Sequence, residues 1–409
     1  MRKSRRDGFV PRVLAYHASR DFVPLYAVYP LLFSDRGVGP GQISLLFIIW
    51  SVTGFVCEVP SGAWADSFDR RRLLVLSAGI YALGFATWTV WQTFAGFAAG
   101  FVCWGLSSAL MSGTFESLVY DELVERGDQA RYPGLIGWAH STAMVANLVA
   151  TASAAVLIHV AGYGLVGWTS VGFAVCQGLL AATLPVSYRA RHAHDRPGLA
   201  DDGSALVEAE QAASQYVRML RAGLAESRHH PDVRRVLLLA AVMVGLTTYD
   251  EYFPLVARAH GVATATVPLL VAITVAGQVV GTALTGWSAR FGRRTIATVL
   301  GLGAVLVTIG VLVSPYIGFV AIGVGYGLAN NAMLVGETRL QDTITGPARA
   351  TVTSVLGLLE EVVALVAFGV FAIGARWLGF PTLVALFGIP AVLVAVAVWR
   401  WLPGARDDS

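Results

Sequence analysis

EVPSGAWADSFDRRR, residues Glu58 to Arg72, lies between two long apolar runs. It places a proline, a glycine, two aspartates and three consecutive arginines in a short stretch. A weaker echo, TGWSARFGRR, spans Thr285 to Arg294 and also separates apolar runs. A basic turn repeated between hydrophobic runs predicts two membrane-embedded halves, each hinged at its turn.

The composition is that of an integral membrane protein. The 409 residues are 56% hydrophobic and 13% charged, and the mean hydropathy is +0.63, whereas a soluble domain averages roughly 25% charged residues. A span needs about 20 apolar residues, so twelve spans would use roughly 240. We therefore predict an all-α polytopic membrane protein with twelve transmembrane helices in two pseudo-symmetric six-helix bundles.

The apolar runs divide the chain into three segments. The expected spans lie near residues 11–33, 43–65, 72–91, 95–119, 134–158, 164–186, 234–257, 266–289, 295–313, 317–340, 351–374 and 380–402. The long polar link between the sixth and seventh spans contains a stretch, 205–225, that could form an amphipathic surface helix. We expect an N-terminal bundle at 1–186, a cytoplasmic linker at 187–233 and a C-terminal bundle at 234–409.

Basic residues indicate the orientation. All but four of the 29 lysine and arginine residues fall on one side of this arrangement; Arg36, Arg258 and Arg376 fall on the other side, and Arg20 lies within a span. Because cytoplasmic loops carry the excess of basic residues, both termini, the linker and both turns should be cytoplasmic. The expected location is the inner (plasma) membrane.

The two halves resemble each other at matching places. Span 1 reads SRDFVPL from Ser19 and span 7 reads YDEYFPL from Tyr249, which aligns Asp21 with Glu251. The inner ends of spans 4 and 10 each carry two acids five residues apart: Glu116 and Asp121, Glu337 and Asp342. Together with the two basic turns, these matches predict a duplicated fold.

The first turn carries a pattern known from one transporter family. It reads G-x-x-x-D-x-x-x-R-R, with Gly62, Asp66, Arg70 and Arg71. With twelve expected spans and a large central link, the chain resembles the major facilitator superfamily of secondary transporters, whose turn reads G-x-x-x-D-R-x-G-R-R. The resemblance implies alternating access, in which this turn latches the halves in one conformation and releases them in the other. We expect four more gate residues at the cytoplasmic face: Asp121, Arg290, Arg294 and Asp342.

The gate acids need partners. We expect Asp121 and Asp342 to pair with arginines such as Arg131, Arg339 or Arg349. The chain departs from common family patterns in two spans, because span 4 has no arginine and span 5 lacks the glycine–proline signature of many drug–proton antiporters. The resemblance therefore supports a transporter better than an antiporter.

Charges inside spans indicate where the chemistry lies. A charge at mid-bilayer costs about 2.5–3.5 kcal/mol on insertion scales, so it needs a function or a partner. Arg20 stays charged and requires an acid neighbour, for which we expect Glu116, or an anionic substrate. Asp250 and Glu251 are adjacent acids in apolar surroundings, which suits reversible protonation. We predict that Asp21, Glu116, Asp250 and Glu251 carry proton coupling; structural ion pairs are the alternative.

Polar and aromatic side chains on the same spans are candidates for a solute path. Small polar residues also join helices in membranes, which is the alternative for each single Ser or Thr. The expected substrate-cavity residues are His17, Arg20, Tyr26, Trp50, Ser112, His140, Asn147, Tyr249, Tyr252, Gln278, Asn330, Glu337 and Glu361.

Several function classes are excluded by their missing motifs. The chain has no G-x-x-x-x-G-K-[ST] loop and a single lysine, Lys3, which argues against ATP hydrolysis. It has neither an H-E-x-x-H nor a G-x-S-x-G motif. We expect no enzyme activity, no catalytic residue, no metal, no cofactor and no nucleic-acid partner; the energy source would be a proton gradient.

The preferred function is export of small organic or drug-like compounds by a proton-coupled, monomeric secondary transporter. Uptake of an organic anion, by symport or uniport with Arg20 as the partner of the anion, is the alternative. A third possibility, from another class, is a non-transporting membrane receptor or assembly protein.

Overall fold

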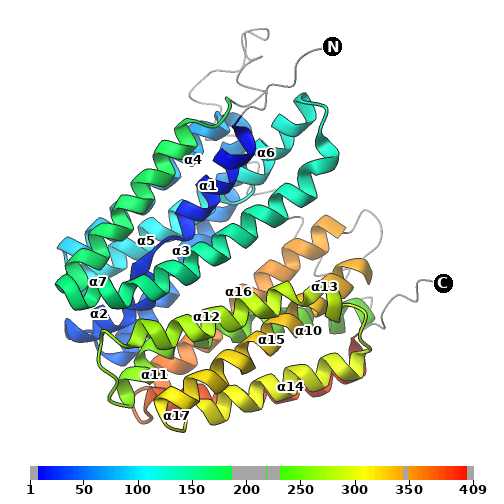
Figure 1. Ribbon diagram of the computed structural model, residues 1–409. Helices are drawn as coiled ribbons and strands as arrows, with labels where there is room; N and C mark the ends of the chain where they lie inside the picture. The colour runs from blue at the N-terminus through cyan, green and yellow to red at the C-terminus, as the bar shows by residue number, and fades with distance from the viewer. Residues whose placement is uncertain (1–7, 187–217, 219–230, 344–348, 403–409) are drawn as a thin grey trace. The chain divides into compact units, whose positions relative to one another are not determined.

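The computed structural model describes residues 8–186, 218, 231–343 and 349–402, and in these ranges all regular secondary structure is helical (Figure 1). The all-α prediction is therefore confirmed. The expected linker, 187–233, including the amphipathic stretch 205–225, lies outside the described residues except for Arg218 and the start of the next helix at Pro231.

Contacts within the chain define two compact units. Unit 1 comprises Met1–Tyr26 and Ile49–Tyr216, and unit 2 comprises Ala27–Ile48 and Val217–Ser409. The segment Ala27–Ile48, which precedes most of unit 1 in the sequence, therefore packs with the second part of the chain. This assignment decides which side chains meet at the acidic site described below.

Unit 1 is a bundle of long helices around a buried apolar core. Helices α1 and α4 both pack against α7, and α4 also packs against α5. Tyr16, Phe115 and Leu118 belong to its core. The helices are α1 (Phe9–Asp21), the later part of α3 (Pro40–Ser67), α4 (Arg70–Val90), α5 (Phe94–Met111), α6 (Thr114–Glu125) and α7 (Tyr132–Ala182).

Helix α7 covers two of the expected spans. Its 51 residues contain non-helical backbone at Ala161 and Gly162, and Gly162 has a φ of 65°. Glycine adopts this left-handed conformation without the steric cost of a Cβ atom. The chain can therefore reverse there with almost no loop, which agrees with the expected spans at 134–158 and 164–186.

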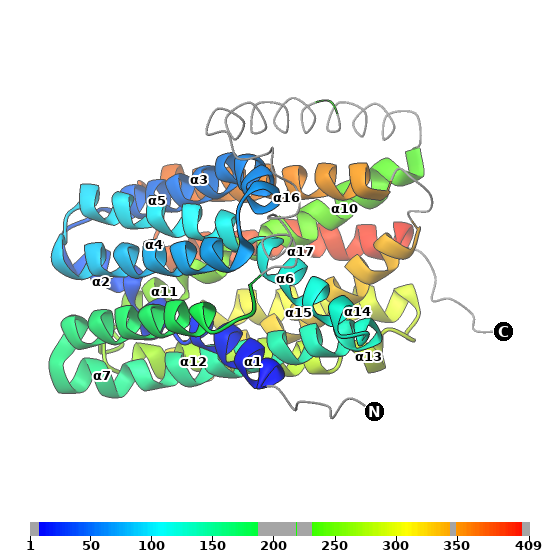
Figure 2. The ribbon, with the colours of Figure 1, turned by 90° about the horizontal axis from the view of Figure 1, so that it is seen from above.

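Unit 2 packs its helices around α15 and α14. Helix α15 contacts both α12 and α14, α14 contacts α17, and α10 lies along α16 (Figure 2). The elements are α2 (Tyr29–Asp35), the first part of α3, α10 (Pro231–Gly245), η4 (Leu246–Tyr252), α11 (Phe253–Ala259), α12 (Val267–Ala283), α13 (Thr285–Ser288), α14 (Arg293–Gly310), α15 (Pro315–Thr343), α16 (Arg349–Gly374) and α17 (Phe380–Trp401).

Glycines allow α12 and α15 to approach closely. A Cβ atom on Gly277 would lie 1.9 Å from the carbonyl oxygen of Gly323, and one on Gly327 would lie 2.4 Å from that of Gly277. Small residues let helix backbones come into contact in membranes, where packing rather than the hydrophobic effect drives helix association. The glycine contacts thus fix the spacing of these two helices.

Spans 1 and 7 are interrupted rather than continuous. Helix α1 ends at Asp21 and is followed by a short 3-10 segment, η1 (Pro24–Ala27), before α2 begins. In span 7 the 3-10 segment η4 separates α10 from α11, which has Pro254 in its first turn. Because proline lacks an N–H group, it breaks the ladder of a continuous helix. The spans expected at 11–33 and 234–257 therefore each consist of two helices joined by a 3-10 segment.

Span 4 also breaks. Helix α5 ends at Met111 and α6 begins at Thr114, with Gly113 at a φ of 67° between them. The span expected at 95–119 therefore consists of two helices, and the second continues to Glu125. Residues before and after Gly113 therefore do not share one face of a continuous helix.

Eight of the described helical stretches are long and apolar enough to cross a membrane, and one of them, Gln129–Ala182, contains the two spans of α7. The interrupted spans 1 and 7 fall short of that length because each is split. Helix α12 is apolar but shorter, at Val267–Ala283.

Candidate functional site

The guanidinium group of Arg20 is buried inside unit 1. Only 6% of the residue is exposed. Its Nη2 atom donates to the Ser108 hydroxyl at 3.2 Å, and the group lies over the Tyr81 ring, 4.6 Å from the ring centre. Its Nη1 atom is buried and has no hydrogen-bond partner. The guanidinium is thus bound through Nη2, while Nη1 is buried without a hydrogen-bond partner.

The expected pairing of Arg20 with Glu116 is not formed. No ion pair joins Arg20 to a described carboxylate, and Glu116 Oε2 is itself buried without a hydrogen-bond partner. Arg20 lies at the end of α1, whereas the break at Gly113 places Glu116 in the first turn of a separate helix. The expected partner therefore belongs to a helix that starts after the break in span 4.

An aromatic cluster is linked to Arg20 through Tyr81, over whose ring the guanidinium lies. Tyr26 stacks on Trp104 with ring centres 4.9 Å apart, and Trp50 lies 4.9 Å from the same ring. The Tyr26 and Tyr81 hydroxyls are hydrogen-bonded to each other. Tyr26 and Trp50, both expected cavity residues, are half-buried, so this aromatic cluster has an accessible side.

Two histidines meet one turn earlier along α1. His17 Nε2 lies 3.4 Å from His140 Nδ1, and the His17 ring packs against Phe115 with centres 5.0 Å apart. His17 is buried, whereas His140 is exposed. The structure thus brings together the three expected cavity residues His17, Arg20 and Tyr26 on one side of unit 1, with His140 beside them.

The neighbouring acids Asp250 and Glu251 lie in η4 of unit 2. The Tyr326 hydroxyl donates to Asp250 Oδ2 at 2.5 Å, and the Tyr29 hydroxyl donates to Glu251 Oε2. No ion pair joins either carboxylate to a described residue. Each acid therefore has a tyrosine as its hydrogen-bond donor and no positive partner in this part of the chain.

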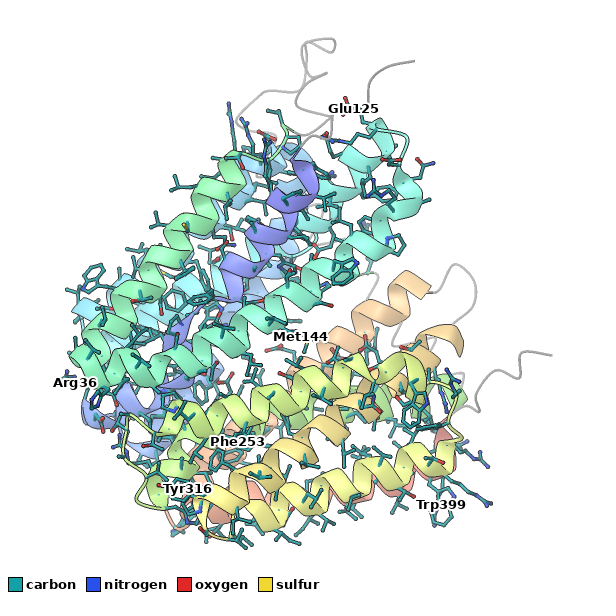
Figure 3. The ribbon with its side chains drawn as sticks, in the orientation of Figure 1. Arg36, Glu125, Met144, Phe253, Tyr316 and Trp399 are labelled. Atoms are coloured by element: carbon teal, nitrogen blue, oxygen red, sulfur yellow. The ribbon has the colours of Figure 1, made fainter. Side chains whose placement is uncertain are left out.

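Residues near these acids continue the aromatic environment. Tyr252 shares a 2.8 Å hydrogen bond with Ser44, and Tyr249 is buried with its ring 6.2 Å from Tyr326. Phe253, labelled in Figure 3 at the start of α11, packs edge-on against Tyr326 at 5.8 Å. The two acids of unit 2 thus lie among aromatic side chains. In unit 1, Asp21 ends the corresponding interrupted helix.

Other expected cavity residues make contacts within or between helices. Asn330 donates to Thr282 Oγ1 at 2.8 Å and to the Gln278 carbonyl at 3.3 Å, which joins α15 to α12. Ser112 is exposed and donates to Glu58 at 2.9 Å, and Asn147 accepts from Thr151. Glu337 and Glu361 are half-buried and close enough to Glu360 to repel it.

The first basic turn is shorter than expected. Helix α3 continues through Gly62 and Asp66 to Ser67, and α4 begins at Arg70 with Asp69 as its N-cap. The Asp69 side chain accepts from the Arg71 backbone N–H at 3.3 Å. The stretch is therefore mostly helix, and the side chain of Asp66 lies outside the described part of the structure.

Arg70 forms an ion pair with Asp121 of α6. This corrects the expectation that Asp121 pairs with Arg131, Arg339 or Arg349. Arg131 pairs instead with Asp128 at 3.5 Å, because the break at Gly113 directs α6 and its acid toward the start of α4. Two predicted gate residues are thus joined to each other.

The second basic turn is bound in a different way. Arg339 of α15 donates to the backbone carbonyls of Ala289, at 2.9 Å, and of Phe291. Arg290 and Arg294 are exposed, and the side chains of Asp342 and Arg349 lie outside the described residues. The two turns are therefore each bound by a residue at the end of another span, one by an acid and the other by an arginine.

The sequence model of the Major Facilitator Superfamily matches residues 17–341. The chain belongs to the major facilitator superfamily. It is a membrane transporter and not an enzyme, and its family implies a small-molecule substrate and a lipid environment. No curated protein matches the sequence.

Solved transporters share the fold. A D-xylose–proton symporter aligns with a TM-score of 0.69 and 13% identity, over 98% of this chain and 97% of the symporter. The nucleoside transporter NupG, in a mutant form, aligns with a TM-score of 0.70 and 12% identity, over 96% of this chain and 99% of NupG. The fold is that of twelve helices in two bundles, as predicted.

Several polar contacts of this transporter were not anticipated from its sequence. Tyr29, Tyr81 and Tyr326 hold the buried charges, and Asp35 binds Arg258 through two hydrogen bonds of 2.6 and 3.2 Å. The Asp35–Arg258 pair could have been predicted from the sequence. An aspartate follows the SRDFVPL motif of span 1, and an arginine follows the matching YDEYFPL motif of span 7. No sequence pattern identified the partners of the three tyrosines, because those partners are distant in sequence.

Proposed function

We propose that this transporter exports small organic compounds in exchange for protons, and that Asp250 and Glu251 carry the proton. The observation that supports this is the pair of adjacent acids in η4, each bound by a tyrosine hydroxyl and neither paired with a described basic residue. An acid in a membrane segment that lacks a positive partner can accept a proton reversibly at a modest cost.

The hydrogen bond from Tyr29 links protonation of Glu251 to the packing of the segment Ala27–Ile48. It belongs to Ala27–Ile48, the early segment that packs into unit 2, and it donates to Glu251. A hydrogen bond to a charged carboxylate is stronger than one to a neutral acid. Protonation of Glu251 therefore weakens the attachment of this segment to unit 2. A proton can shift a conformational equilibrium only through such a difference between states.

The remaining features of the proposal come from the charge pattern and the family. The protein is placed in the plasma membrane with both termini in the cytoplasm, acts as a monomer and needs no cofactor besides the proton gradient. Uptake of an organic anion is the second candidate, and the buried Arg20 with its open Nη1 atom favours it.

The test uses a bacterium that lacks its major efflux pumps. Cells express the wild type, Asp250→Asn, Glu251→Gln or a control, at matched membrane levels. Growth is measured with ethidium, chloramphenicol and salicylate, which represent a cation, a neutral compound and a carboxylate. The control is Glu125→Gln, at the exposed end of α6 (Figure 3).

Export predicts that the wild type and the control resist at least one compound, and that resistance falls to the vector level in both acid variants. Greater sensitivity with the wild type would indicate uptake instead. Unchanged resistance in the Asp250→Asn, Glu251→Gln double variant would contradict the assignment of the proton site.

A further inference from the structure

We infer that Arg20 and its aromatic neighbours form the site for one carboxylate group, so that the substrate is a ring-bearing organic monocarboxylate. This deepens the proposed function, on which its role in transport rests, by naming the substrate class. The inference depends on how the guanidinium is held, on which of its atoms is open and on what surrounds it.

The first observation is that Arg20 is fixed in place by neutral groups. Ser108 accepts from Nη2, and the Tyr81 ring lies under the guanidinium plane. The Tyr81 hydroxyl also donates to the Arg20 backbone carbonyl at 3.4 Å. None of these groups carries a negative charge, so they position the guanidinium without forming an ion pair with it.

The second observation is the open edge. Nη1 is buried and lacks a hydrogen-bond partner, and a buried donor without a partner is costly to leave unsatisfied. Asp21 follows directly in the sequence, yet it forms no ion pair with Arg20. A negatively charged acceptor beside Nη1 would satisfy this buried donor.

The third observation is the local charge. Within unit 1, the other described arginines lie near helix ends: Arg12, Arg70, Arg71, Arg72, Arg126 and Arg131. Arg20 is thus the described arginine of unit 1 that lies inside a span, with Asp21 as an electrostatic neighbour. A monoanion beside it would bring less uncompensated charge into the membrane than a dianion such as phosphate. A planar carboxylate also fits the planar guanidinium better than a tetrahedral anion does.

The fourth observation concerns the body of the ligand. Tyr26 and Trp50 are half-buried and pack on Trp104. Aromatic faces of this kind favour a flat apolar ring in offset or edge-on contact. A carboxylate at Nη1 would place such a ring against the accessible side of this cluster.

The test measures binding rather than transport, with the purified full-length protein in detergent. Benzoate, indole-3-acetate and cyclohexanecarboxylate are the probes, benzamide is the neutral isostere and inorganic phosphate is the anion without a ring. Calorimetric titration and thermal unfolding compare the wild type, Arg20→Gln and a matched control, Arg126→Gln. Arg126 is also in unit 1 but is paired with Glu122 at 2.6 Å.

At least one carboxylate should bind the wild type and the control, with at least tenfold weaker binding to Arg20→Gln. Benzamide and phosphate should not bind. If Arg20→Gln does not fold, Ser108→Ala removes the support of Nη2 and should weaken carboxylate binding severalfold with the charge retained. Failure of all three carboxylates to bind the wild type, or equal binding of benzamide, would overturn the inference and leave a bound water as the partner of Nη1.

The experiment separates this inference from the proposed function. Glu251→Gln should bind the carboxylates like the wild type, because Glu251 belongs to the other unit. Carboxylate binding without proton-linked export would reject the proposed function alone. Proton-linked export of a neutral compound with no carboxylate binding would reject the substrate class alone.

Discussion

Three charged side chains within the spans of this transporter have neutral partners. Arg20 has Ser108 and the Tyr81 ring, Asp250 has Tyr326, and Glu251 has Tyr29. Arg70 and Asp121 differ, since they form an ion pair near the ends of their helices. Charges in the spans are therefore held by tyrosine hydroxyls and rings, which fix a position without cancelling the charge.

Removal of the Tyr29 hydroxyl tests this arrangement at the scale of one bond. Tyr29→Phe should lower the free energy of unfolding in detergent by about 1.5–3 kcal/mol, the usual contribution of a hydrogen bond to a charged group. In a Glu251→Gln background, Tyr29→Phe should lower the free energy of unfolding by less, because the group that accepts the Tyr29 hydrogen bond is neutral there. Tyr316→Phe, at an exposed position, is the control and should change stability little. Equal losses in both backgrounds would show that Tyr29 acts independently of Glu251.

At the scale of elements, the breaks in helices matter more than their lengths. Spans 1 and 7 are each split by a 3-10 segment beside their acids, and span 4 is split at Gly113. Interrupted helices in transporters place backbone groups and polar side chains at the substrate and ion sites. Continuous helices such as α12 and α15 pack closely against each other and do not contain such breaks.

Because α12 and α15 are in close contact, glycine-to-alanine substitutions inside and outside this contact should differ strongly in their effect on stability. Gly277→Ala would place a methyl group 1.9 Å from the Gly323 carbonyl oxygen and should destabilise the protein by a few kcal/mol. Gly357→Ala, on α16, meets nothing within 4 Å and should be neutral or slightly stabilising. Thermal unfolding of both purified variants is the measurement. Comparable unfolding temperatures would show that the helices can separate without cost.

At the scale of the whole molecule, the segment Ala27–Ile48 distinguishes this conformation. It belongs by sequence to the first group of spans but packs with Val217–Ser409 in unit 2. Tyr29, Asp35 and Ser44 bind Glu251, Arg258 and Tyr252, respectively. Alternating access would require these contacts to break and re-form in each cycle.

A reversible cross-link tests that requirement. In a background without Cys57, Cys103 and Cys176, the variant Asp35→Cys/Arg258→Cys is treated with a short bis-methanethiosulfonate reagent. Export of a compound from the growth assay should fall at least tenfold and recover after reduction with dithiothreitol, because the linked segment can no longer leave unit 2. Asp35→Cys alone, treated in the same way, should keep its flux. Full activity of the linked protein would mean that this contact persists through the cycle.

The amino-acid sequence by itself determined the membrane class, the twelve spans, the helical fold and the family. Each of these depends on local properties, namely apolar runs of sufficient length and a ten-residue motif at the end of the second span. It also selected Arg20, Asp250 and Glu251, because a charge within an apolar run is visible without any structure.

Only the tertiary structure decided the partners of those charges. Glu116 was the expected partner of Arg20, but a single glycine in the left-handed conformation ended the helix between Ser108 and Glu116. Tyr29 reaches Glu251 across 222 positions in the sequence, and no local pattern encodes such a contact. Side-chain partners depend on how helices pack, which is set by many weak contacts distributed along the whole chain, whereas a span depends only on its own residues.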